Sequence, residues 1–139
     1  MFFKKKNIIN KENNNLEKIA ALLIHVAKID ENYAEKEEEI IKQTLIKIGA
    51  KNENIQEILK AGKKIEDNSN QILEFTKEVK NMDDDGKIKI LEALWRIIYS
   101  NNIADIYEMS LMRRLGGLLY IDSKIMGDIK EKIKNEFSK

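Results

Sequence analysis

Apolar residues recur at helical spacing along almost the whole chain, and no proline interrupts them. Steps of three and four residues place side chains on one face of an α-helix, whereas a strand would show sustained alternation. The stripes lie within seven segments, residues 16–26, 41–48, 55–59, 72–82, 88–98, 112–119 and 126–137. The pattern predicts an all-α fold, a compact bundle of about seven helices.

Residues typical of helix ends separate these segments. Glycine favours the position just after a helix, and Ser, Asp and Asn favour the position just before one. The predicted C-caps are Gly49 and Gly62, and the predicted N-caps are Asn52, Ser69, Asp83 and Asp122. We expect one helical domain over residues 15–139, preceded by a flexible N-terminal tail at residues 1–14.

The charge balance and the absence of cysteine exclude several kinds of function. The 139 residues include 25 basic and 24 acidic ones, so no overall field favours nucleic acid. Without cysteine there is no disulfide, zinc–thiolate site or thiol nucleophile. These features predict a protein that binds no nucleic acid.

The apolar run Ile19–Ile24 is the longest in the chain, and it is too short to cross a bilayer, which takes about 20 residues. Phe2 and Phe3 precede three lysines and could touch a membrane surface, so membrane association is peripheral at most. We expect a cytoplasmic protein.

The two halves of the chain share an apolar pattern. A shift of 71 positions aligns Leu23 with Leu94 and Glu37 with Glu108, and several further apolar pairs follow. A duplicated helix pair would give this pattern and an internal pseudo-twofold bundle.

Two segments between predicted helices carry candidate ligands. The first, residues 28–39, holds six acids against two lysines, and the second is residues 99–108. Oxygen ligands clustered at a helix–turn–helix joint suit calcium or magnesium. The same acids could instead cap a helix or stabilise its N-terminus through the dipole. Spacing alone leaves both interpretations open.

Known catalytic and metal motifs do not fit the sequence. A calcium loop starting at Asp30 would have Ala34 and Ile41 at ligand positions, and Asp83–Asp85 reads better as a helix cap. His25 is the only histidine, and no phosphate-binding glycine loop or nucleophile elbow is present. We therefore expect no enzyme activity.

Other distinctive residues have structural interpretations beside functional ones. Gly116 and Gly117, inside a helical period, indicate close helix–helix approach. Arg113 and Arg114 could grip an anion or pair with acids of the bundle. Trp95 is predicted to be buried in the fifth helix.

Three segments resemble the TerB-like tellurite-resistance family, whose helical domain also occurs in some J-domain co-chaperones. Residues 20–30 resemble its first helix and turn, and residues 91–102 resemble the second copy. Residues 107–119, Tyr-Glu-Met-Ser-Leu-Met-Arg-Arg-Leu-Gly-Gly-Leu-Leu, are similar to its Tyr-Glu-x-x-Leu-Ile-Arg-Arg-Ile-Ala-x-Leu-Leu run. The resemblance implies a pseudo-symmetric helical bundle linked to tellurite resistance, stress responses and membrane-associated complexes.

The resemblance also implies a divalent cation, such as calcium, magnesium or manganese, bound at the acidic turns. The implied ligands are Asp30 and Glu37 in the first copy, and Asn101, Asp105 and Glu108 in the second. Asn101 stands where the family has aspartate, so we expect the first turn to dominate. The alternative is a metal-free module that binds an unidentified protein partner through its acidic first turn and the Arg113–Arg114 face.

Overall fold

The computed structural model describes residues 2–28, 35–68, 73–100 and 106–137, and it describes side chains from residue 15 onward except at 73, 74, 106 and 107. The described residues form seven helices and no strand, which confirms the predicted all-α class. The helices are α1 (Phe2–Ala27), α2 (Glu35–Lys47), α3 (Ile55–Asp67), α4 (Leu73–Lys80), α5 (Asp84–Tyr99), α6 (Ile106–Leu118) and α7 (Ser123–Phe137).

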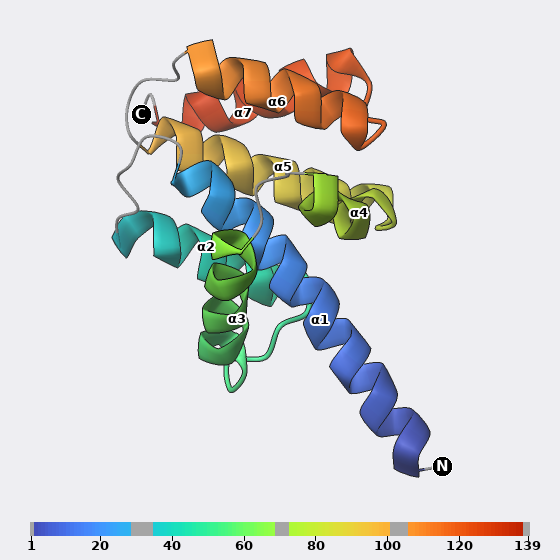
Figure 1. Cartoon of the computed structure of the whole chain (residues 1–139). Coiled ribbons are helices and arrows are strands. Elements are labelled where there is room, and N and C mark those ends of the chain that lie inside the picture. Colours follow the sequence, from blue (N-terminus) through green and yellow to red (C-terminus); the bar gives the residue numbers. More distant parts are fainter. Residues whose placement is uncertain (1, 29–34, 69–72, 101–105, 138–139) are drawn as a thin grey trace.

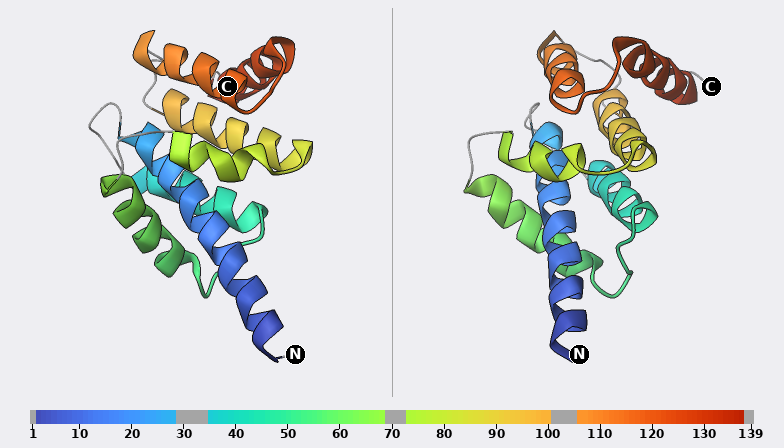
Figure 2. Two further views of the ribbon diagram at one scale, coloured as in Figure 1. Left: turned by 45° about the vertical axis from the view of Figure 1, so that its right-hand side comes forward. Right: turned by 90° about the vertical axis from the view of Figure 1, so that its right-hand side faces the viewer.

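Helix α1 is the central element of the fold. It contacts α2, α3, α4 and α5, and α3 and α2 lie on opposite sides of it in the right-hand view of Figure 2. Ala20–Ile24 are therefore buried on every side, with no exposed surface. A helix that is apolar all round belongs in a core when neighbours surround it. No described helix is long and apolar enough to span a membrane.

The N-terminal part of α1 projects away from the other helices (Figure 1). Residues 2–14 are helical, and their flexibility stays a prediction.

Helices α1 and α3 approach each other closely at Gly62. A Cβ built at Gly62 would lie 2.8 Å from the Ala20 Cβ and 3.2 Å from the Ala21 backbone nitrogen. The prediction of Gly62 as a C-cap is wrong, because α3 continues to Asp67 and the glycine instead lets two backbones meet. The N-cap of α3 is Asn54 rather than the predicted Asn52.

Three of the other predicted capping residues are confirmed. The Asp83 carboxylate accepts a hydrogen bond from the Gly86 amide at 2.8 Å, and Asp122 accepts one from the Lys124 amide at 3.0 Å. Gly49 follows α2 with φ of +123°, a conformation that favours glycine. Ser69 lies outside the described residues.

Helices α5, α6 and α7 form the other end of the molecule (Figure 1). The Arg96 guanidinium of α5 donates two hydrogen bonds to the Glu136 carboxylate of α7, both at 3.0 Å, which holds the pKa of Glu136 below its ordinary value. The buried Lys87 ammonium of α5 donates to the Leu119 carbonyl at the end of α6, at 3.2 Å. Charged contacts thus tie both helices to α5.

The ends of α2 and α6 have the same hydrogen-bond pattern. The Gly49 and Ala50 amides donate to the carbonyls of Ile46 and Leu45. Exactly 71 residues later, the Tyr120 and Ile121 amides donate to the carbonyls of Gly117 and Gly116. Tyr120 also has a positive φ, 57°, like Gly49. This repeated cap supports the duplication, which stays a prediction.

Candidate functional site

The first turn of α2 is the best described part of the acidic segment at residues 28–39. Glu35, Glu37 and Glu38 lie there, where negative charge is stabilised by the helix dipole. Their environments differ: Glu35 is exposed, and Glu38 lies 3.5 Å from the Lys63 ammonium of α3. Only Glu37 is fully buried, with 0% of its surface exposed. It is the one acid of this turn directed into the protein.

Glu108 is the counterpart of Glu37 in the second half of the chain. Glu37 is the third residue of α2, and Glu108 is the third residue of α6. Glu108 is 2% exposed. A glutamate at this position can reach back to the backbone at the helix start, as in a capping box. It can equally present an oxygen to a cation held by the preceding turn.

The helix ends that flank the two acidic turns are in contact. The Lys36 ammonium, in the first turn of α2, donates a hydrogen bond to the Ser100 carbonyl just after α5, at 2.6 Å. Ser100 is itself buried, and its hydroxyl donates to the Ile97 carbonyl at 2.6 Å. This contact brings the end of the first turn next to the start of the second.

The remaining ligands implied by the resemblance, Asp30, Asn101 and Asp105, lie outside the described residues. Over the ranges that the structure does describe, no group of three or more acidic or histidine side chains is placed to hold a metal ion. A cation site at the two turns would therefore need oxygens from residues 29–34 or 101–105 in addition to Glu37 and Glu108.

His25 lies in a separate polar cluster where α1 and α3 end. Its Nδ1 atom is 3.3 Å from a Glu66 carboxylate oxygen. The Lys28 ammonium donates to both Glu66, at 2.7 Å, and Asp67, at 2.9 Å, and these hydrogen bonds raise the pKa of Lys28. Since a lysine already neutralises these acids, the cluster joins two helices and does not suit a cation.

The two arginines of α6 have different surroundings. Both are exposed, and neither forms an ion pair with any residue in the described ranges. Arg113 lines a pocket between α5, α6 and α7, whereas Arg114 does not. Sequence reasoning treated them as one pair and missed this pocket. Its signal was three glycines, at 116, 117 and 127, inside helical stretches.

Comparison with known proteins identifies one family. The family described as tellurite resistance protein TerB matches residues 16–131, which include α2 to α6, the C-terminal part of α1 and most of α7. No curated protein and no solved structure is significantly similar to the chain. The matched segment contains both buried glutamates and both acidic turns.

Proposed function

The chain belongs to the tellurite resistance TerB family, and we propose that it is a cytoplasmic, non-catalytic domain of the tellurite or stress response that binds a divalent cation. The proposed cation is calcium, magnesium or manganese, held where the two acidic turns meet. Its ligands come from Asp30 and Glu37 in the first turn and from Asn101, Asp105 and Glu108 in the second.

The observation that carries this proposal is the burial of two carboxylates at matching positions. Removing an ionised carboxylate from water costs several kcal/mol unless nearby groups offset its charge. Glu37 and Glu108 are both buried at the same point of a helix that follows an acidic turn, and each has other interactions within the protein. The helix N-terminus and these interactions offset part of the cost, and a divalent cation shared with the turn would stabilise the two carboxylates further.

The meeting of the flanking helix ends supports a single cation-binding region. Hard cations take six or more oxygen ligands, more than one short turn supplies easily. The Lys36–Ser100 contact joins the start of α2 to the end of α5, so both turns could contribute oxygens to one cation.

Calorimetric titration of the metal-stripped protein with calcium, magnesium and manganese tests the proposal. We predict weak, saturable binding that the double change Asp30→Asn and Glu37→Gln abolishes. The change Asp105→Asn and Glu108→Gln should weaken it less, because the second turn already lacks one carboxylate.

Asp84→Asn with Asp85→Asn is the matched control, since it removes two exposed acids from another helix start and should leave binding unchanged. Circular dichroism of each variant checks that the fold is retained. A wild-type protein that binds none of the three ions would contradict the proposal.

The alternative function is a metal-free module that binds a protein partner. The exposure of Arg113 and Arg114 supports it, since solvent-facing arginines at a groove are suited to acidic partners. Failure of all cation binding in the titration would favour this alternative.

A further inference from the structure

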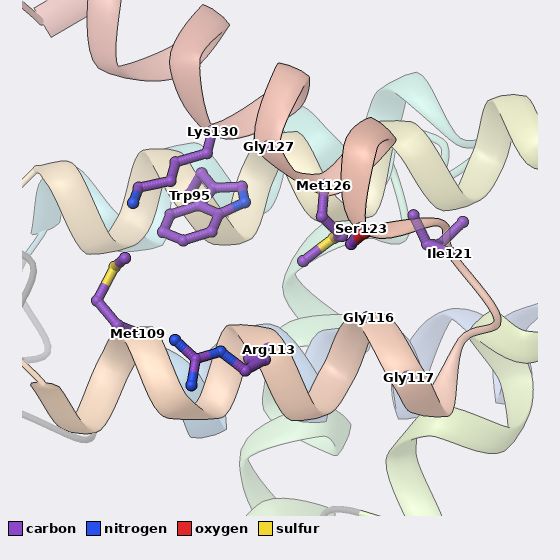
Figure 3. A pocket seen from close by; sticks show the side chains of 10 residues that line it. All are labelled: Trp95, Met109, Arg113, Gly116, Gly117, Ile121, Ser123, Met126, Gly127 and Lys130. Carbon is purple, nitrogen blue, oxygen red and sulfur yellow. The ribbon is translucent and has the colours of Figure 1, made fainter.

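A pocket of about 440 Å³ lies between α5, α6 and α7 (Figure 3). Its volume is within the range of about 300–1,000 Å³ that is typical of sites for small molecules. Trp95, Met109, Ile121 and Met126 supply most of its apolar wall. Such walls suit the body of an organic ligand rather than a hydrated ion.

The charged residues of this pocket are all positive. Arg113 and Lys130 line it and no acid does, although the chain as a whole has nearly equal numbers of acids and bases. Neither cation forms an ion pair with any residue that the structure describes. The Lys130 ammonium instead lies 5.7 Å from the centre of the Trp95 ring. The pocket therefore combines apolar surface with two cationic groups available to an anion.

Trp95 provides a second indication of a ligand. Trp95 is only 3% exposed, and its indole N–H has no acceptor among the described residues. Figure 3 shows the nitrogen edge of the ring turned toward the Met126 side of the pocket. A buried donor without an acceptor costs about 1–3 kcal/mol, a cost that an acceptor entering the pocket would reduce.

Missing side chains keep the pocket open. A Cβ at Gly117 or Gly127 would have no atom within 4 Å, so larger residues there would project into free space. Gly116 is different, because its Cβ would lie 3.1 Å from the Met126 Cγ. Residues at 117 and 127 could therefore fill the pocket without pressing on the core.

We propose that this pocket binds a small organic anion, a single carboxylate or sulfonate on an apolar body. The Arg113 guanidinium, which presents paired donors, holds the anionic head, and Lys130 adds a second positive charge. The apolar body packs on Trp95 and the two methionines. A polyphosphate would leave this apolar wall unused, and a neutral hydrocarbon would leave both cations unused.

Two fluorescent probes of nearly the same shape separate the contribution of the anionic head from that of the apolar body. Anilinonaphthalene sulfonate carries an anionic head, and N-phenyl-1-naphthylamine has the same ring system without it. We expect saturable binding of the sulfonate, weakened about tenfold by Arg113→Gln, as loss of a charge-assisted hydrogen bond predicts. The neutral probe should bind more weakly, and Arg113→Gln should not change its affinity.

Arg114→Gln is the matched control, because it removes the same charge from the neighbouring residue outside the pocket. Gly127→Leu should abolish binding of both probes while circular dichroism and the unfolding temperature show an intact fold. Equal weakening by the two arginine changes, or undiminished binding in a folded Gly127→Leu protein, would overturn the proposal. So would a sulfonate that fails to saturate the wild-type protein.

Discussion

Two glycines in helices show how differently one residue type is used in this protein. Gly62 is needed for the contact between α1 and α3, because its Cβ would meet Ala20 at 2.8 Å. Gly127 has no neighbour within 4 Å of its Cβ, so it is a helix residue without a packing role. Glycine inside a helix costs about 0.5–1 kcal/mol relative to alanine, and of these two glycines Gly62 is the one with a structural reason for that cost.

The change Gly62→Ala should therefore destabilise the protein by about 1–3 kcal/mol, the usual cost of overpacking a core. Gly127→Ala should instead stabilise it by about 0.5–1 kcal/mol through better helix propensity. Urea unfolding followed by circular dichroism measures both. A stabilising Gly62→Ala change would mean that α1 and α3 are not in such close contact.

The caps after α2 and α6 are the clearest sign of a repeated unit at the scale of elements. The same pair of hydrogen bonds closes both helices, with glycine at the left-handed position of the first and Tyr120 at that of the second. Tyr120 is 73% exposed, and the Lys80 ammonium lies 4.7 Å from its ring centre. The second cap has thus kept its geometry with a residue that strains it.

Substitutions at the left-handed positions of the two caps should change the free energy of unfolding in opposite directions. Gly49→Ala should cost about 1–3 kcal/mol, since φ of +123° is strained for any side chain even in open space. Tyr120→Gly should raise stability by no more than about 1 kcal/mol, because the lost contact with Lys80 offsets part of the relieved strain. Thermal unfolding measures both, and a neutral Gly49→Ala change would argue against the cap.

The sequence predicts the helices better than their contacts. Periodic apolar residues identify all seven helices, and the caps at Gly49, Asp83 and Asp122 are confirmed because they depend on local backbone chemistry. Gly62 was misread because glycine serves both helix ends and close helix contacts, and the two uses look alike in one sequence.

For the candidate sites too, the sequence predicts individual residues better than it predicts how the helices place them. Glu37 and Glu108 were predicted from a turn and a resemblance, while their burial depends on how the helices pack around them. The pocket beside Trp95 could not be predicted, because it requires the relative placement of three helices.

The two proposed sites lie in different regions of the molecule and would suit ligands of opposite charge. One region is the junction of helix ends beside Lys36 and Ser100, with buried carboxylates that suit a cation. The other is the pocket between α5, α6 and α7, with arginine and lysine that suit an anion. Both lie largely within the segment that matches the TerB family.

A calcium titration followed by backbone amide NMR tests most directly whether the two acidic turns form one cation site. We predict saturable shift changes at the first turns of α2 and α6 together, residues 35–38 and 106–109, with one shared affinity. The exposed acids Asp84 and Asp85 should show no saturable change. Shifts spread evenly over all acidic helix starts, or none at Glu37 and Glu108, would contradict the claim.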